Sequence, residues 1–458
     1  MLLDNIKVNT QLKFSEDYHS DLNKFKFWES SYAADSGYAY GKDERGNPII
    51  SRFTCEEESD YSDRLKKVTC RSHITNIINR YNSSVFGNGV SRSFANAKYQ
   101  EWLYNVDGYG STMSEFMRGT LLEAQIYGKS YFWVDSSASE SEVTSIATSE
   151  SVSSIFRKIE IQNIVSYEEI NNKLTEILFL VQANDGEWLA LYFNANERVT
   201  LHLSNQGNSY TIKSIDEVVE HGYSQIPVVK CEPDIFSESQ VASIAGSLKK
   251  VTNYLSLRDA ELYDQTFTRF IISGIRQTDN EETGQKNSIQ WGTRRMLMVE
   301  DGNVKVDRVG ADVSQSESLT KAIVEEEIAL YRSASLQASD PFKTGESASG
   351  LAKIVDRNEF ENIAKALMNA VESAENTGAE LAMEAIGISD FVDVTYEDPQ
   401  VADEATDISN LREVLALSIP QVIKDVYIKR FVESNLELSD EELLKLDEQL
   451  SQTQSFIN

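Results

Sequence analysis

The chain has 458 residues, of which 41% are hydrophobic and 10% aromatic, enough to bury cores in roughly three structural regions without disulfide or metal staples. Its 73 acidic residues against 43 basic ones give a net charge of −30, and a field of this sign repels nucleic acid and most membrane surfaces. Three cysteines, no apolar run of membrane-spanning length and an N-terminus without a signal peptide favour a soluble intracellular protein.

Residues 1 to 134 predict helices separated by turns. Apolar residues spaced by three and four positions indicate the helices, and glycine or proline marks the turns. After a first helix and an Arg45–Pro48 turn, the predicted elements are a strand at Pro48–Cys55, helices at 61–86, Ala95–Tyr104 and Thr112–Tyr127, and a strand at Ser130–Val134. Ser111 or Thr112 fits the N-cap of the last helix, and Gly128 ends it.

The next region has β character. Ser136–Ser154 is rich in Ser, Glu and Thr without an apolar period, which predicts an exposed loop or insertion. From Arg157 to Pro227 apolar residues alternate with polar ones or form short runs, which indicates an antiparallel sheet. Asn184-Asp185-Gly186 is typical of a hairpin turn within it.

The stretch Ser237–Gly387 is the one around which we expect the rest of the chain to be organised, and its first segment, Ser237–Phe270, predicts one long helix. Its apolar stripe follows steps of three and four: Val241, Ile244, Ala245, Leu248, Val251 and Leu255. At about 1.5 Å per residue the helix would be roughly 50 Å long, comparable to a small domain. We therefore expect that a monomer leaves much of the stripe exposed and that copies or partners cover it.

The C-terminal half continues with alternating elements. The insert Ile271–Val313 is β-like, with a predicted hairpin turn at Glu300–Asn303. A second helix, Ser314–Leu336, and a loop, Gln337–Ser349, follow it. The remaining predicted elements are a long helix at Leu351–Ile386 with a weak point at Gly378, a strand at Phe391–Tyr396, and acidic helices between residues 403 and 450.

No motif predicts an enzyme, a metal site or a cofactor. Cys70-Arg71-Ser72-His73 is at most half of a zinc site, because no second Cys/His pair exists. Asn105–Gly108 lacks the other ligands of a calcium loop, and Gly345–Gly350 lacks the lysine of a phosphate-binding loop. Glu325-Glu326-Glu327 point to different faces of a helix, so a solvated or channel-facing surface is expected.

Several stretches together resemble the tailed-bacteriophage portal proteins. The stretches that carry the resemblance are Tyr81–Phe86, Asn105–Gly110 with Glu115-Phe116, Ala124–Ser130, His221–Tyr223 with Ile226–Val229, and Glu346–Lys353. Each is degenerate alone, but they occur in the family's order over nearly the whole chain. The order helix, β insert, helix, loop, long helix is similar to the portal order of stem, clip, stem, tunnel loop and wing.

The resemblance implies a portal-like α+β fold, mainly helical, with long stem helices, small antiparallel β regions and a helical C-terminal crown. The implied regions are wing 1–236, stem helix 237–270, clip 271–313, stem helix 314–336, tunnel loop 337–349, wing 350–402 and crown 403–458.

The resemblance also implies a function: a ring, dodecameric in the family, at one capsid vertex, through which double-stranded DNA is packaged and ejected. Lys343, Phe342 and Thr344 would then face the DNA, although Lys343 read alone is as readily an exposed loop lysine. The implied clip contacts to the large terminase subunit and head-tail adaptor are Arg276, Lys286, Trp291, Arg294 and Arg295. Capsid and scaffold proteins complete the implied partners, and the implied location is the virion.

Two other classes of protein stay open at this point. The main alternative is an acidic oligomeric assembly scaffold that never contacts DNA, and a ring with a central channel would distinguish a portal from it. A hydrolase is a weaker alternative, since four histidines in different elements do not assemble a site.

Overall fold

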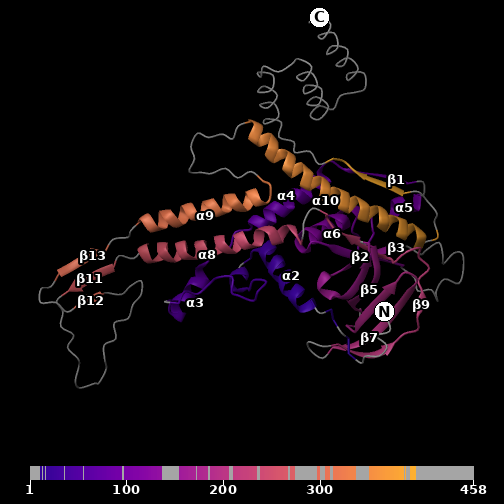
Figure 1. Cartoon of the computed structure of the whole chain (residues 1–458), viewed down its shortest axis with the longest axis horizontal. Coiled ribbons are helices and arrows are strands. Elements are labelled where there is room, and N and C mark those ends of the chain that lie inside the picture. Colours follow the sequence, from indigo (N-terminus) through magenta and orange to yellow (C-terminus); the bar gives the residue numbers. More distant parts are fainter. Residues whose placement is uncertain are drawn as a thin grey trace, which may run out of the picture.

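The computed structural model describes residues 11–136, 154–273, 297–299, 305–309, 313–336 and 350–398, apart from 13, 16, 36, 55, 95–96, 172, 184–185, 206–209, 235–237, 267–268, 386 and 388–391. Within them, a body of helices and antiparallel sheets carries an arm of two long helices, with short strands at the far end (Figure 1). The expected mixed α+β class is confirmed for this part of the chain. The predicted helices of residues 403–450 lie outside it, as does most of the Ser-rich segment.

The N-terminal part of the body is helical, as predicted, with two differences. Its helices are α2 (Tyr18–Ala33), η1 (Tyr38–Tyr40), α3 (Glu58–Lys67), α4 (His73–Gly87), α5 (Ala97–Trp102) and α6 (Met113–Tyr127). A single helix over residues 61–86 is wrong, because the backbone is extended at Val68 and the helix restarts at His73. The strand at Pro48–Cys55 is also wrong: described residues 49–54 form none, since the backbone of Ile49 and Ser51 bonds the side chain of Asn253 instead.

The predicted ends of α6 are confirmed. Thr112 is its N-cap: the hydroxyl accepts a hydrogen bond from Glu115 N, and the Glu115 side chain accepts one from Thr112 N. At the other end Gly128 has a φ of 86°, the left-handed conformation that closes helices.

A three-stranded antiparallel sheet follows α6, in the order β10 (Val228–Cys231), β2 (Ser130–Ser136) and β3 (Ser154–Ile159). Strands β2 and β3 pair from Tyr131 with Ile159 to Ser136 with Ser154, so the two ends of the Ser-rich segment are fixed side by side. The sheet joins the helical part of the body to the larger sheet.

The larger sheet confirms the antiparallel region expected between residues 157 and 227. Its strands are β4 (Ile164–Ile170), β5 (Lys173–Gln182), β6 (Trp188–Asn194), β7 (Glu197–Asn205) and β8 (Tyr210–Ile215), in that order, with β9 (Val219–Glu220) also on β7. Pairing of Gln182 with Trp188 confirms the predicted hairpin. Residues 11–15 connect the end strands: Leu12 N donates to Tyr210 O at 2.9 Å, and Ser15 N donates to Val165 O at 3.1 Å.

The arm consists of α8 (Gln240–Thr266) and α9 (Val313–Ser333), which lie side by side (Figure 1). Both helices were predicted, although α8 is shorter than Ser237–Phe270. Beyond α8 the chain forms β11 (Arg269–Ser273), which lies between β12 (Leu297–Val299) and β13 (Lys305–Val309). The turn predicted at Glu300–Asn303 lies outside the described residues. The strands on either side of it, β12 and β13, each pair with β11 and not with each other, so the hairpin pairing expected there is wrong.

The third long helix, α10 (Gly350–Ala385), packs against the body, beside the two-stranded sheet of β1 (Val90–Phe94) and β14 (Val392–Tyr396). Gly378 is not a weak point, since α10 runs through it unbroken. A Cβ at this position would lie 2.9 Å from ring atoms of Phe132 and Phe156. The glycine therefore lets the aromatic side chains approach the helix backbone closely.

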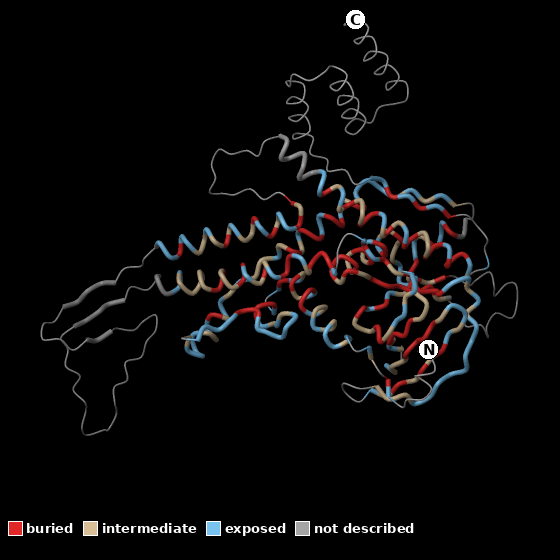
Figure 2. Tube along the Cα trace, in the orientation of Figure 1, coloured by how far each residue is buried: buried red, intermediate tan, exposed pale blue. Residues whose placement is uncertain are grey.

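The apolar stripe of α8 is buried inside this chain, which corrects the expectation that a monomer leaves it exposed. Ile244 and Leu248 belong to the main core of the body, with residues of α4, α6 and α10. Val251 and Leu255 form a separate small cluster with Ile323 of α9. Figure 2 shows buried positions along the facing sides of both helices. The expectation failed because α9 and the N-terminal helices cover the stripe.

Candidate functional site: the collar at the base of the arm

The residues that the resemblance singled out do not form the site described below. Lys343, Phe342 and Thr344, and the proposed clip contacts Arg276, Lys286, Trp291, Arg294 and Arg295, all lie outside the described residues. Within the described part of the chain, charged side chains gather where the arm leaves the body. They come from residues 41–73, here called the collar, and from the two arm helices.

The collar follows one face of α8. Lys249 Nζ lies 2.8 Å from Asp43 Oδ2, and Asn253 both accepts from Ser51 N and donates to Ile49 O. Further along come Ser256, which accepts from Arg64, and Tyr263, whose ring lies 3.7 Å from Lys67 Nζ. Steps of four, three and seven residues keep these positions on the same side of a helix. The collar therefore supports the arm well beyond the point where α8 leaves the core.

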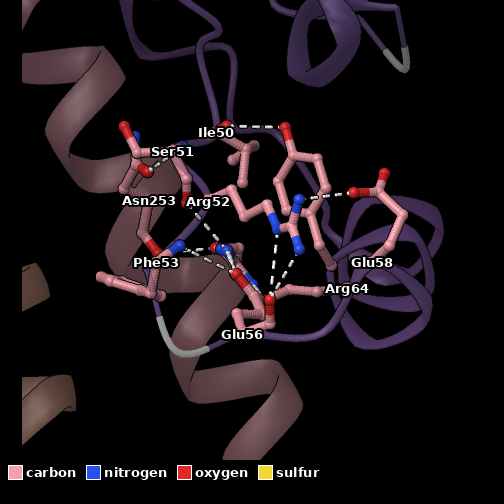
Figure 3. A network of polar contacts seen from close by, with 10 residues as sticks. Ile50, Ser51, Arg52, Phe53, Glu56, Glu58, Arg64 and Asn253 are labelled. Carbon is pink, nitrogen blue, oxygen red and sulfur yellow. Dashed lines mark hydrogen bonds and ion pairs between the residues drawn. The ribbon is translucent and has the colours of Figure 1, made fainter.

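Arg64 on α3 is the centre of the collar (Figure 3). Its Nε and Nη2 bind the two carboxylate oxygens of Glu56 at 2.8 and 2.7 Å. Nη2 also donates to Ser51 O, and Nη1 donates to Ser256 Oγ, both at 2.8 Å. The guanidinium thus joins a loop, α3 and α8 with its fixed fork of donors, which a lysine cannot reproduce.

This ion pair is largely removed from solvent. The side chains of Arg64 and Glu56 are 4% and 12% exposed. The hydrogen bonds from Arg64 lower the pKa of the Glu56 carboxyl, against the effect of burial, and Phe53 N also donates to it. Because a buried charge left without its partner is costly, loss of either side chain would strongly disfavour this arrangement.

A second joint connects the collar to α9. Glu327 accepts from Arg71, and its Oε1 lies 3.0 Å from His73 Nε2. The other ring nitrogen of His73 lies 3.2 Å from the Tyr331 hydroxyl. Burial alone would raise the pKa of the Glu327 carboxyl, but the hydrogen bond from His73 and the charge of Arg71 lower it. The joint fixes α9 to the start of α4.

The two arm helices are also joined by charge at this level. Lys250 on α8 pairs with Glu326 on α9. On another side of α8, Lys249 binds Asp43 of the collar. Burial alone would raise the pKa of the Asp43 carboxyl, but the hydrogen bonds from Lys249 and Asn47 lower it. Glu326 and Glu327 therefore bind within the chain, which corrects for these two residues the expectation of a solvated or channel-facing surface, whereas Glu325 is exposed. The expectation failed because their partners are more than seventy residues away in sequence for Glu326 and more than two hundred for Glu327.

The contacts of the collar are hydrogen bonds and ion pairs that join elements of the fold. In the part of the chain that the structure describes, no group of three His, Cys, Asp or Glu side chains could hold a metal ion. Burial raises the pKa of the Cys70 thiol, which makes it a poor nucleophile. Among the same residues, no helix has the length and apolar content needed to cross a membrane.

Sequence reasoning missed the collar. Its only local signal is Arg64, a basic residue at a position that helical spacing places on the inner face of α3. Ser256 lies 192 residues after Arg64, and Glu327 lies 256 residues after Arg71. The spacing of apolar residues in a sequence cannot indicate contacts between residues so far apart.

Comparison with known proteins gives structural likeness only. No protein-family model matches the chain, and no curated protein matches it. Among solved structures, it is similar to a chain from the neck of an empty gene transfer agent particle, with a TM-score of 0.39 and 10% identity over 81% of this chain and 93% of that one. A chain from the virion of a native gene transfer agent particle gives a TM-score of 0.39 and 9% identity, over 87% of this chain and 96% of that one.

Proposed function

We propose that this chain is the subunit of a portal ring at one vertex of a phage capsid. The ring would be the channel through which double-stranded DNA enters during packaging and leaves at infection. The proposal assigns the chain no enzymatic reaction. Its location would be the virion, after assembly in the host cytoplasm.

The observation that carries the proposal is the two-helix arm. The chain leaves the body along α8, forms three short strands at the far end and returns along α9 (Figure 1). A rod that projects from a body can pack beside copies of itself around an axis and so form the wall of a channel. Leu262 near the far end of α8 is 44% exposed, and a neighbouring subunit of the proposed ring would cover it.

The charge supports the same function. A net charge of −30 gives a wall that repels duplex DNA, so DNA can pass without adhering. A few cations would then suffice for brief phosphate contact. The residues that the resemblance assigns to this contact are Lys343, Phe342 and Thr344.

The remaining parts of the proposal concern partners. The region 271–313 would meet the large terminase subunit during filling and a head-tail adaptor afterwards, and the body would contact capsid and scaffold proteins. The residues proposed for the terminase and adaptor contacts are Arg276, Lys286, Trp291, Arg294 and Arg295. The ring would contain about twelve copies, as the resemblance implies.

Ring formation is the first test. Purified protein should appear in electron micrographs as rings with a central channel, and Leu262→Asp should yield smaller species because a charge enters the proposed contact. Ile170→Asp is the matched control: Ile170 is an exposed apolar residue, 63% accessible, on the large sheet away from the arm. A protein that stays monomeric at all concentrations and salts contradicts the proposal, and closed oligomers without a channel favour the scaffold instead.

The proposed DNA contact has its own test. Lys343→Glu should leave ring assembly intact but reduce DNA packaging or retention several-fold, because it replaces a phosphate-binding cation with a repelling anion. The measurement is packaged DNA per particle, with Lys26→Glu on the exposed face of α2 as control. Equal DNA content in both variants would remove Lys343 from the channel.

A further inference from the structure

Two apolar clusters meet at the base of the arm without merging. The body core includes Leu248 of α8 and Leu330 of α9. The arm has its own cluster of Val251, Leu255 and Ile323. Both helices therefore pass from one core to the other within about one or two turns. The collar contacts α8 over the same stretch and further, from Lys249 beside the body core to Ser256 and Tyr263 beside and beyond the arm cluster.

The collar is anchored in the body on both sides of its arm contacts. Ile49 within it and Ile74 directly after it are fully buried in the body core. Between them the chain reaches out to the arm through Arg64, Arg71 and His73, which bind Ser256 and Glu327. The segment is thus anchored in the body and holds the arm by hydrogen bonds and ion pairs.

Polar joints and apolar cores respond differently to perturbation. A well-packed core resists small displacements, because each lost contact opens a cavity. The collar is held instead by a few directional contacts, and its Arg64–Glu56 pair is largely buried, so removal of one side chain leaves an uncompensated charge. An element with few apolar contacts then opens locally at lower free energy than the core.

We infer that the collar is a brace that sets the tilt of the arm against the body, with Arg64 as its central contact. Arg64 joins α3 to residues 51–57 through Glu56 and Ser51, and joins both to α8 through Ser256. When Arg64 is lost, α3 and residues 51–57 leave α8, and the arm helices open locally while the body stays folded. What this opening would serve, a change in the width of a channel, rests on the proposed function, and the opening itself does not.

The test is hydrogen exchange of the full chain, measured by mass spectrometry at neutral pH. Arg64→Ala should make amides of residues 51–67, of α8 beyond Val251 and of α9 before Glu327 exchange roughly tenfold faster. Amides of β4 to β7 should keep their wild-type rates. Arg64→Lys, which retains the charge but not the paired geometry, should give a smaller rise in the same peptides.

Arg92→Ala is the matched control, because Arg92 forms the other well-buried arginine–glutamate pair described in the body, with Glu375. It should speed exchange in β1, β14 and α10 and leave the arm unchanged. If Arg64→Ala does not fold, Glu56→Gln should show the same pattern with a smaller amplitude.

Two results would overturn the brace. One is faster exchange in residues 51–67 with an unchanged arm, which would make the collar a surface loop. The other is an equal rise in β4 to β7, which would mean global destabilisation. Electron microscopy of the same variants scores ring formation separately, so absence of rings would reject the portal proposal and leave the exchange result standing.

Discussion

Gly128 is the residue at which backbone geometry is most restrictive. It ends α6 with a φ of 86°, and a Cβ there would lie 1.6 Å from the carbonyl oxygen of Glu238. Left-handed backbone costs other residues about 1–2 kcal/mol, and the clash adds to this. We expect Gly128→Ala to lower the free energy of unfolding by about 3 kcal/mol, measured by urea denaturation followed by circular dichroism.

Gly246 provides the opposite case for comparison. It lies within α8 with nothing within 4 Å of an added Cβ. Gly246→Ala should raise the free energy of unfolding by about 0.5–1 kcal/mol, because alanine loses less entropy in a helix. Similar effects of the two substitutions would show that the close approach at Gly128 is relieved by a small backbone shift.

At the scale of elements, the sequence predicted the features that neighbouring residues determine, namely the ends and the positions of helices. Thr112 with Glu115 and Gly128 fixed the ends of α6, because a capping box and a left-handed glycine act within one helical turn. Spacing of apolar residues likewise predicted α8, α9 and α10. Errors arose where a tertiary contact replaced a local one, as at Val68, where the chain turns to bring Arg71 to Glu327.

In the sheets, too, local features were predicted and the pairing of distant segments was not. Alternation and short apolar runs predicted the strands of the large sheet. Strand β7 alternates because one of its faces lies on a core, whereas the centres of β5 and β6 are continuous apolar runs because their two faces contact two different cores. These patterns could not predict that β11 lies between β12 and β13, because the pairing partner of a strand is set by the path of the chain and not by its own pattern. Nor could they place Leu12 between the end strands, 198 residues before its hydrogen-bond partner Tyr210.

For the candidate site, sequence reasoning identified the individual charges without their partners. His73 and Arg71 were considered as parts of a zinc half-site, and Glu327 as part of a solvated run. In the structure they bind one another. A run of three glutamates does not indicate which of them is partly buried. Glu327 is partly buried and joins α9 to the collar because Arg71 and His73 lie opposite it in the structure.

At the scale of the whole molecule, acid acts in two opposite directions. Lowering the pH protonates exposed carboxylates and reduces the self-repulsion of a chain with a net charge of −30. It also removes the charges of the collar, where the carboxyls of Asp43, Glu56 and Glu327 have lowered pKa values. A group whose pKa is lowered by folding contributes stability above its usual value and loses it as the pH falls through the lowered one.

Comparing wild type with Glu327→Gln separates these two effects, because loss of self-repulsion is nearly the same in both proteins and cancels in the difference. At pH 7 the variant should be less stable by about 1–3 kcal/mol, since Arg71 and His73 lose a charged partner. As the pH falls below about 4.5, the usual value for this carboxyl, the wild-type protein should lose its advantage and the two melting temperatures should converge. Glu325→Gln, which changes an exposed residue two positions away on α9, is the control and should differ little from wild type at neutral pH. A difference between wild type and Glu327→Gln that persists unchanged to pH 3 in calorimetry would show that packing, and not the charge of Glu327, holds α9 to the collar.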